Sequence, residues 1–154
     1  MVVGGGQELG LIYLGKGKVG GALAAHEVVP VDEGERCGIP QVHQHEYPFR
    51  NVGALWCWSD NFGLSWRLEN ALLVGNRMQA CAPPVRLADG TLIIPAYCAI
   101  GRSAVSSAVL YRSDDGGENW SELTVIARGR PRTRGYAEPV LMELGPGHLL
   151  CMLR

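Results

Sequence analysis

Short apolar runs separated by polar, glycine-rich turns repeat along the chain. The runs 53–58 and 107–112 each lead into a polar turn, and the runs 67–74 and 121–127 follow those turns. Each run has the length of a strand, and no long stretch shows the period of about 3.6 residues that marks an amphipathic helix. The pattern predicts an all-β protein built from antiparallel hairpins.

The two polar turns share the pattern Ser-x-Asp/Asn-x-Gly-x-x-Trp, which resembles the Asp box of β-propellers. "SDNFGLSW" starts at Ser59, and "SDDGGENW" starts at Ser113. The shared positions are Ser59, Asn61, Gly63 and Trp66 in the first copy and Ser113, Asp115, Gly117 and Trp120 in the second. Serine and Asp or Asn side chains fold back onto backbone N–H groups in such turns, and glycine adopts a positive φ. We therefore expect a structural role, with both tryptophans buried under equivalent turns and each indole N–H reaching a backbone carbonyl.

A second repeated element surrounds the first. "VRLADGTLIIPAYC" (Val85–Cys98) resembles "MELGPGHLLCMLR" (Met142–Arg154), and the turn residue Gly147 corresponds to Gly90 at nearly the same spacing as the two polar turns. The combined order is strand, glycine turn, strand, connection, strand, Asp-box turn, strand. This order predicts a four-stranded antiparallel unit of the kind that forms a propeller blade.

The repeats divide the chain into three parts. Residues 1–77 are predicted to hold the end of one blade, in which a long insertion from about Lys16 to Asn51 precedes the first Asp-box hairpin. Residues 78–128 are predicted to form one complete blade, and residues 129–154 the first hairpin of the next. Since propellers close with typically four to eight blades, we expect the chain to be a partial propeller.

Both faces of the last hairpin are apolar. With Pro146 as its midpoint, one face carries Val140, Met142, Leu144, Leu150 and Met152, and the other carries Leu141, Leu149, Cys151 and Leu153. A sheet with one solvated face should alternate apolar and polar residues. We therefore expect both faces to be covered in a complete propeller, and uncovered faces of a partial one to favour self-association.

Charge and composition exclude several classes of partner. The 154 residues include 14 basic and 15 acidic side chains, a net charge of −1. This balance gives no general reason to expect binding to nucleic acid or to an anionic membrane. No apolar run approaches the roughly 20 residues of a membrane span, and the N-terminus lacks the features of a signal peptide, which leaves localisation open.

Cysteine and histidine do not predict a metal site or another cofactor. None of the five cysteines forms a Cys-x-x-Cys pair, and Cys57, Cys98 and Cys151 lie in apolar strand candidates, where a free thiol acts as a small hydrophobe. His43 and His45 could ligate a metal from one side of an extended segment. There is no third or fourth ligand at a defined spacing, so the interpretation is an ordinary polar loop.

The stretch "YAEPVLMELGPGHLLCMLR" (Tyr136–Arg154) resembles the sialidase (neuraminidase) family, whose pattern there is Asn-Glu-x-x-x-x-Glu-Leu-x-Asp-Gly-x-Leu followed by a few residues and an Arg. The matching positions are Glu138, Glu143, Leu144, Gly147, Leu149 and Arg154. "GTLIIPAY" and "AVLYRSDDGGENW" upstream resemble the preceding blade of that family, so the resemblance covers most of residues 78–154. It implies a six-bladed propeller that cleaves terminal sialic acids from glycoconjugates with retention at the anomeric carbon.

The resemblance also implies roles for two residues. Glu138 matches the glutamate that acts as base to a tyrosine nucleophile, an exception to the two-carboxylate scheme of most glycosidases. Arg154 matches one of three arginines that grip the carboxylate of the sugar, a task suited to the planar guanidinium fork. Equal spacing from Pro146 predicts that Glu138 and Arg154 face each other in a regular hairpin, where an ordinary cross-strand ion pair is the alternative interpretation.

The chain departs from the family pattern at several points. Ala137 stands where the family often has Asn, and Pro146 replaces the Asp before the turn glycine. The first arginine and the acid Asp are not evident, and the third arginine and the tyrosine would lie beyond Arg154. We expect a central fragment of about three blades that is inactive alone. The alternative is a non-catalytic propeller that binds glycans or acts in assembly.

The loop "ARGRPRTRG" precedes the sialidase-like stretch and contains Arg128, Arg130, Arg132 and Arg134. These arginines could attract a sialylated glycan or a related acidic sugar. A solvated loop is the interpretation that its arginine, proline and glycine content favours.

Overall fold

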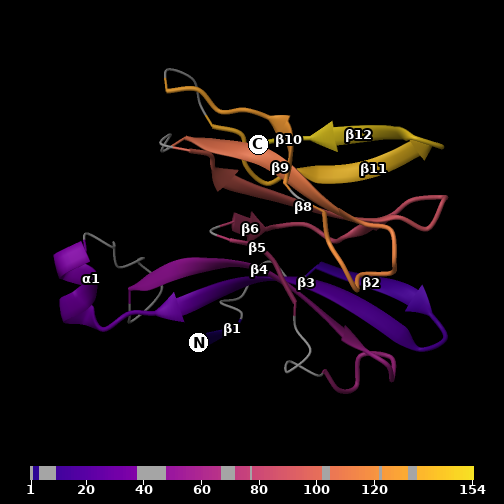
Figure 1. Ribbon diagram of the computed structural model, residues 1–154, viewed down its shortest axis with the longest axis horizontal. Coiled ribbons are helices and arrows are strands. Elements are labelled where there is room, and N and C mark those ends of the chain that lie inside the picture. Colours follow the sequence, from indigo (N-terminus) through magenta and orange to yellow (C-terminus); the bar gives the residue numbers. More distant parts are fainter. Residues whose placement is uncertain are drawn as a thin grey trace.

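The computed structural model describes residues 2–3, 10–37, 48–66, 72–76, 78–101, 105–121, 123–131 and 135–154. Three antiparallel sheets lie one above another (Figure 1). The predicted all-β class is confirmed, because α1 (Val31–Cys37) is the only helix in the described part of the chain. Among those residues, no helix has the length and apolar character needed to span a membrane.

The first sheet and the second sheet have the same topology. The first sheet comprises β1 (Val2–Val3), β2 (Gly10–Gly15), β3 (Lys18–Val28), β4 (Phe49–Ser59) and β5 (Leu72–Asn76). The second sheet comprises β6 (Met78–Ala80), β7 (Val85–Arg86), β8 (Leu92–Ala99), β9 (Ser106–Ser113) and β10 (Thr124–Ala127). In each sheet two short strands pair with the same long strand, and the next two strands follow in chain order.

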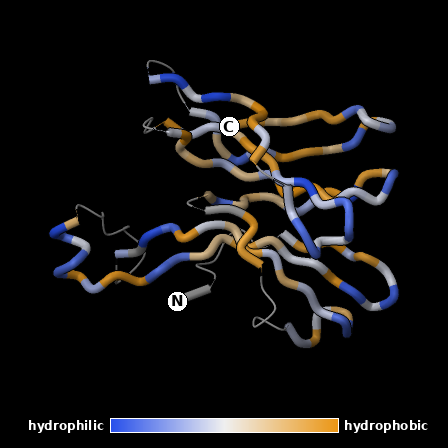
Figure 2. The backbone as a smooth tube through the Cα atoms, in the orientation of Figure 1, coloured by the Kyte–Doolittle hydropathy of each residue, from blue (hydrophilic) through white to orange (hydrophobic). Residues whose placement is uncertain are grey.

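The third sheet is the hairpin of β11 (Val140–Gly145) and β12 (His148–Met152). Val140 pairs with Met152, and Met142 pairs with Leu150, which is the register expected for a hairpin centred on Pro146. The hairpin turns at Gly147, whose φ of 75° suits glycine. The tube in Figure 2 is predominantly orange along both strands, in agreement with the apolar pattern of the sequence.

The segment from Lys16 to Asn51 was expected to be an insertion, but it contains the strand β3. This strand pairs with β4 from Val19 opposite Ser59 to Val28 opposite Phe49. The sequence of β3, "KVGGALAAHEV", is rich in glycine and alanine, which weakens the strand pattern. The small residues have a packing reason, because a Cβ added to Gly20 would overlap the ring of Trp56. Residues 2–76 thus hold a sheet with the strand order of the second sheet, rather than only its last strands.

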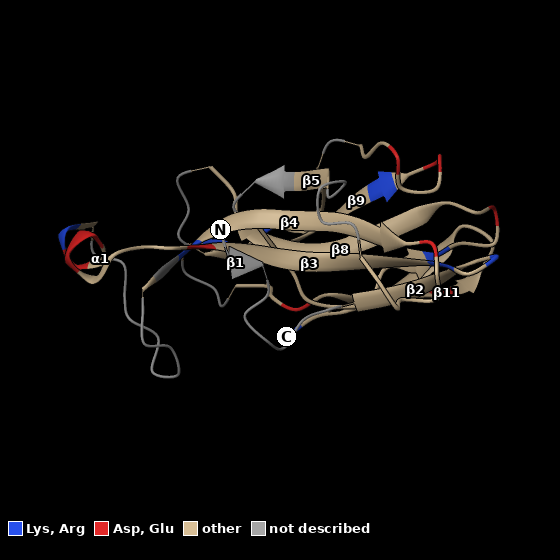
Figure 3. Ribbon diagram, turned by 90° about the horizontal axis from the view of Figure 1, so that it is seen from below, with Lys and Arg blue, Asp and Glu red and all other residues tan. Residues whose placement is uncertain are grey.

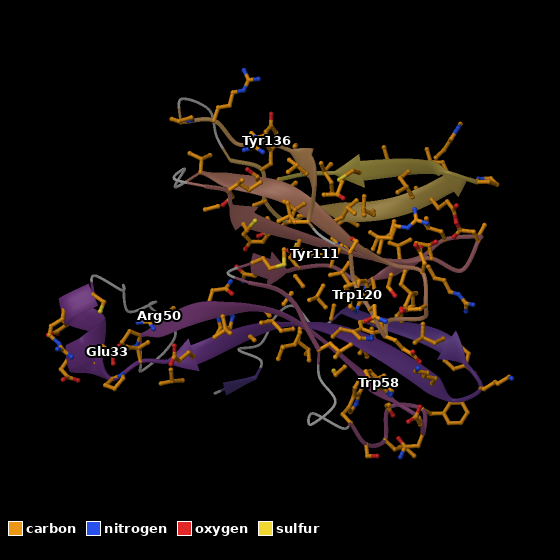
Figure 4. All side chains as sticks on the ribbon, in the orientation of Figure 1. Glu33, Arg50, Trp58, Tyr111, Trp120 and Tyr136 are labelled. Carbon is orange, nitrogen blue, oxygen red and sulfur yellow. The ribbon has the colours of Figure 1, made fainter. Side chains whose placement is uncertain are left out.

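The core lies between the first and second sheets. Ala22, Ala54 and Trp56 from the first sheet meet a larger set from the second, namely Met78, Ala80, Leu92, Ile94, Ala96, Cys98, Val109 and Tyr111. Trp56 is buried, and its ring lies edge-on to Trp120, with centroids 5.3 Å apart and planes at 65°. This is a favourable aromatic arrangement. Figure 4 shows Trp120 in the space between the two sheets.

The two turn tryptophans are less deeply buried than expected. Trp66 and Trp120 are both half-buried. The Trp66 indole Nε1 donates to the carbonyl oxygen of Gly63 at 3.1 Å, as anticipated, whereas the Trp120 Nε1 has no hydrogen-bond partner among the described residues. The ring that lies against the glycine of the second turn is Trp56 of the other sheet, since a Cβ on Gly117 would overlap it.

The third sheet contacts the second sheet through one face. Leu141 on that face is buried, and the Glu143 carboxylate oxygen Oε2 accepts a hydrogen bond from the Ala88 backbone N–H at 2.8 Å. The opposite face, which carries Met142 and Met152, is exposed. An uncovered apolar face is what was expected of a partial propeller, because the covering of both faces was expected only of a complete one.

Gly117 and Gly116 offer a matched test of the contact between the sheets. Both have positive φ, 97° and 76°, so alanine is strained at either position. Only at Gly117 would the added Cβ also overlap Trp56, because the space around Gly116 is open. We expect Gly117→Ala to lower the free energy of unfolding by about 1–3 kcal/mol more than Gly116→Ala, the usual cost of overpacking. Urea unfolding of the two variants measures the difference, and equal losses would contradict the contact.

Candidate functional site

Glu138 and Arg154 lie together at the open end of the third sheet. The Arg154 Nη2 atom is 2.7 Å from the Glu138 Oε1 atom, and the side chains are 77% and 33% exposed respectively. The pairing predicted from the sequence therefore exists in the structure. An ion pair this exposed contributes only about 0–1 kcal/mol to stability.

The backbone at this end differs from a regular hairpin. Arg154 exchanges two 3.0 Å hydrogen bonds with Ala137, not with Glu138. Because Val140 pairs with Met152, the chain from Ala137 to Val140 contains one residue more than the opposite strand. This irregularity corrects the expected register, and it leaves the Glu138 side chain free to turn towards the guanidinium.

Glu138 has an unusual backbone conformation. Its φ is 50°, one of three positive values at non-glycine residues in the described part of the chain. A non-glycine residue there costs on the order of 1–3 kcal/mol, and such residues cluster at functional sites. Pro139 follows directly, and it is buried. Its carbonyl oxygen accepts a hydrogen bond from the Cys81 thiol at 3.9 Å, so the segment after Glu138 is fixed to the second sheet.

The chain reaches the site through a segment that is held against the start of β9. The Tyr136 N–H donates to the Ser106 carbonyl oxygen at 2.9 Å, and the Gly129 N–H donates to the Ser107 hydroxyl oxygen at 3.0 Å. A Cβ on Gly129 would overlap the Ser106 carbonyl oxygen, and one on Gly135 would lie only 3.0 Å from it. Glycine is therefore needed for this close approach. The approach places the segment that leads to Glu138 beside the start of β9.

The predicted arginine cluster lies in this segment. Arg128 and Arg130 are exposed, whereas Arg132 and Arg134 are outside the described residues, as are His43 and His45. Charged residues colour mainly the turns and α1 in Figure 3, and the strands are almost entirely uncharged. Any charge-based recognition by the described residues therefore uses the ends of the sheets.

The first Ser-x-Asp/Asn-x-Gly-x-x-Trp turn is closed by side-chain oxygens. The buried Ser59 hydroxyl oxygen accepts from the Gly63 N–H at 3.0 Å and from the Asn61 N–H at 3.3 Å. The Asn61 Oδ1 atom accepts from the Ser65 N–H at 2.9 Å and from the Ser59 hydroxyl at 2.8 Å. The side chains thus satisfy the donors that the turn leaves without strand partners.

The second turn repeats these bonds at the equivalent positions. The Ser113 hydroxyl oxygen accepts from the Gly117 N–H at 2.9 Å, and the Asp115 Oδ1 atom accepts from the Asn119 N–H at 2.9 Å. Ser113 pairs with Leu92, next to the glycine turn before β8. That sheet end is equivalent to the Gly147 end of the third sheet, away from Glu138 and Arg154. The eight turn residues thus lie away from the ion pair.

Hydrogen bonding in the second turn lowers the pKa of one carboxyl group. The backbone and side-chain amides of Asn119, followed by the Ser113 hydroxyl, lower the pKa of the Asp115 carboxyl from 3.8 to about 2. In contrast, burial raises the pKa of the Cys57 thiol to about 11 and raises the thiol pKa of Cys98 and Cys151. These thiols therefore remain protonated near neutral pH. No group of three or more His, Cys, Asp or Glu residues in the described ranges could hold a metal ion.

Sequence reasoning missed one charged cluster. Arg50 lies 3.2 Å from Glu27 and 3.5 Å from Glu33, through Nη1 and Nη2 respectively. Figure 4 shows Glu33 on α1 and Arg50 near the helix. All three side chains are 40–53% exposed, so the cluster contributes little stability. All three residues lie in the segment that was interpreted as an insertion, in which neither β3 nor α1 was predicted.

No protein-family model and no curated protein matches this sequence. Several solved structures resemble the fold, among them the following two. A protein of unknown function from Dyadobacter fermentans DSM 18053 matches with a TM-score of 0.72 and 18% identity over 96% of this chain. The Hadza microbial sialidase Hz136 matches with a TM-score of 0.62 and 18% identity over 95% of this chain.

The chain spans 43% of the length of the first of these proteins and 28% of the second. At this identity the likeness shows the fold alone: antiparallel β-sheets in an arrangement shared with a sialidase. The likeness alone assigns neither an activity nor a substrate to this chain.

Asp115 gives a pH-dependent prediction. Because its folded-state pKa is depressed from 3.8 to about 2, its contribution to stability is complete above the unfolded value and is lost as the pH falls through the folded value. The double variant Asp115→Asn, Asn119→Ser copies the first turn, which has Asn61 and Ser65. We expect this variant to lose less stability than the parent between about pH 4 and pH 2. Urea unfolding across this pH range measures it, and identical slopes would refute the assignment.

Proposed function

We propose that the chain is part of a sialidase-type glycoside hydrolase, in which the three sheets are successive blades of a six-bladed propeller. Glu138 and Arg154 contribute to a site for a terminal sialic acid or a related acidic sugar. The eight residues of the two turns act as structural Asp boxes. The observation that carries the proposal is the Glu138–Arg154 pair, which combines the sialidase-like sequence pattern with a 2.7 Å contact.

Arg154 is suited to the carboxylate of the sugar. Its side chain is 77% exposed, and a guanidinium has five N–H donors in a fixed fork that matches a carboxylate. Hydrogen bonds to charged groups contribute about 1.5–3 kcal/mol each. The guanidinium can therefore hold a ligand carboxylate while a donor remains for Glu138.

Glu138 is suited to accept a proton. In the proposed reaction the anomeric carbon already bears a carboxylate, so a neutral tyrosine avoids the repulsion that an anionic nucleophile would meet. A neighbouring carboxylate must then take the phenol proton. The positive φ of Glu138 and the buried Pro139 set the backbone from which the carboxylate projects towards Arg154. The tyrosine, the acid Asp and the remaining arginines have no assigned position in this chain.

The first experiment measures binding of N-acetylneuraminic acid to the chain by titration in NMR. We expect a dissociation constant no tighter than millimolar, and about ten-fold weaker binding by Arg154→Ala, which loses one charge-assisted interaction. Arg112→Ala is the matched control, because Arg112 also lies 2.7 Å from a carboxylate, that of Asp114 on the second turn. An equal effect of Arg112→Ala, or equal binding of the sugar methyl ester, would count against the carboxylate site.

The second experiment measures turnover of a fluorogenic sialoside. Groups that act as a unit lose nearly all activity when one is removed. We therefore expect no measurable hydrolysis by this chain, which supplies only Glu138 and Arg154. In a protein that supplies the remaining groups, Glu138→Gln should mainly lower kcat, whereas Arg154→Ala should mainly raise KM. Robust hydrolysis by this chain that survives Glu138→Gln would overturn the residue assignment.

A non-catalytic role in glycan binding or assembly is the second candidate. The exposed apolar face of the third sheet favours it, because exposed apolar patches mark interaction sites. The binding experiment distinguishes an assembly module, which needs no preference for the acidic sugar over its ester. A glycan-binding module is distinguished by turnover, because a protein that supplies the remaining groups would bind the sugar without hydrolysing the sialoside.

A further inference from the structure

A pocket lies between the first and second sheets at the end that carries the turns, away from Glu138 and Arg154. Its volume is about 170 Å³, and its walls are Leu14, Lys18, Arg86, Gly90, Leu92 and Gly116. We call these six residues the turn-end pocket. They belong to two sheets that pack on each other within this chain (Figure 1). The pocket is smaller than the roughly 300–1,000 Å³ of a site for a drug-sized ligand, so it suits a small group.

The turn-end pocket has two charged side chains, and both are basic. Lys18 comes from the first sheet and Arg86 from the second, and neither forms an ion pair with a described residue. The Arg86 Nη1 atom donates to the Leu14 carbonyl oxygen at 3.5 Å, a long bond that leaves most of the five guanidinium N–H donors. The Lys18 Nζ atom lies 5.3 Å from the centroid of the Trp58 ring, a contact that does not neutralise its charge.

The carboxylates next to the pocket walls have partners of their own. Asp89 precedes Gly90, and its Oδ1 atom accepts from the Thr91 N–H at 2.9 Å. The Asp114 Oδ1 atom accepts from the Arg112 Nε at 2.7 Å, and the remaining acid of that turn accepts from turn amides. The acids are thus engaged in the turns, whereas the two basic side chains of the pocket have no carboxylate partner in the described part of the chain.

The junction of the second and third sheets shows that the stacking does not require an arginine. With Gly90 aligned on Gly147, Glu143 takes the place of Arg86. The Glu143 carboxylate accepts from the Ala88 N–H at 2.8 Å, so its charge serves the contact between those two sheets. A carboxylate at this position therefore closes one junction, while the other junction keeps a guanidinium with unused donors.

The lysine is replaced in the same way. With Gly17 aligned on Gly90, Thr91 takes the place of Lys18. Thr91 is buried, and its hydroxyl donates to the Asp114 carboxylate at 3.2 Å. Both positions thus carry a cation at the first junction and neither does at the second. The pair of cations belongs to this pocket and not to the repeat.

We propose that the turn-end pocket binds a phosphate group, either inorganic phosphate or the phosphate of a monoester. The Arg86 fork matches two phosphate oxygens, and Lys18 supplies a second charge as a point donor. A dianion engages both charges, whereas a carboxylate has one charge and is matched by the guanidinium alone. Leu14 and Leu92 add apolar walls of low dielectric, which strengthen the field of the two cations. The site is separate from the proposed acidic-sugar site.

The test is an NMR titration of the isotope-labelled chain at low ionic strength and about pH 8, above the second pKa of a phosphate monoester. The amide signals of Gly90 and Gly116 report on the pocket. We expect saturable shifts with a millimolar dissociation constant for glucose 6-phosphate or inorganic phosphate. Lys18→Thr and Arg86→Gln should each weaken binding about ten-fold, because each removes one charge-assisted interaction. Lys16→Gln is the matched control, since Lys16 is exposed on the same hairpin but does not line the pocket.

Two further ligands define the chemistry. Tighter binding of glucose 6-phosphate than of inorganic phosphate would identify an ester as the ligand, and the reverse order would identify the free ion. Equal binding of acetate would show that one negative charge suffices and would overturn the assignment to phosphate. Circular dichroism checks the folding of each variant. As a readout on the parent chain itself, phosphate should raise the melting temperature, because a ligand that binds only the folded state stabilises it.

The remaining outcomes decide whether a site exists and where it lies. Equal weakening by Lys16→Gln would indicate diffuse attraction to a basic surface and would refute the pocket. Arg154→Ala should leave phosphate binding unchanged, and a loss in that variant would place the anion at the opposite end of the molecule. Absence of shifts at both Gly90 and Gly116, with no rise in melting temperature, would overturn the proposal outright.

Discussion

The arrangement of the sheets depends on the burial of one large ring, that of Trp56. The ring projects from β4 into the space between the first and second sheets, where it meets Gly20 of its own sheet and Gly117 of the other. Neither position has room for a Cβ. A tryptophan buries on the order of 150–250 Å², and here that surface is removed from water only if the two sheets stack in one orientation. The turn at Gly117 is thus both a local structure and part of the contact between the first and second sheets.

This stacking determines which groups gather at each end of the molecule. The glycine turns and the two serine-anchored turns lie at one end of the sheets, where the side-chain oxygens of Ser59, Asn61, Ser113 and Asp115 satisfy turn amides. The open end of the third sheet carries Glu138 and Arg154, and the bond between Glu143 and Ala88 fixes this hairpin to the second sheet. Structural and candidate chemical residues are therefore separated along the strands.

Much of this organisation could be predicted from the sequence, because it depends on local interactions. Apolar runs and turn glycines identified the hairpins, and the symmetry about Pro146 gave the register of Met142 with Leu150. Long-range packing could not be predicted in the same way. The strand β3 was not recognised because it is rich in glycine and alanine. These small residues leave room for the ring of Trp56, which lies on the next strand of the sheet but far along the sequence. The place of Trp56 against Gly117 likewise depends on a contact between sheets that no local pattern encodes.

The contact between Glu138 and Arg154 was predicted, but its backbone geometry was not. The spacing of Glu138 and Arg154 indicated a cross-strand pair, yet Arg154 shares its backbone bonds with Ala137. A strand pattern reveals neither the extra residue before Val140 nor the positive φ of Glu138.

The central claim is that Trp56 joins the two sheets by direct contact with Gly117. Two-dimensional NOE spectroscopy tests it most directly, because the indole Hε1 proton of Trp56 and the Hα protons of Gly117 belong to different sheets. A strong cross-peak between them is the result that this contact predicts. Its absence from a well-resolved spectrum of the folded chain, together with cross-peaks from Trp120 to Gly117 in its place, would contradict the claim.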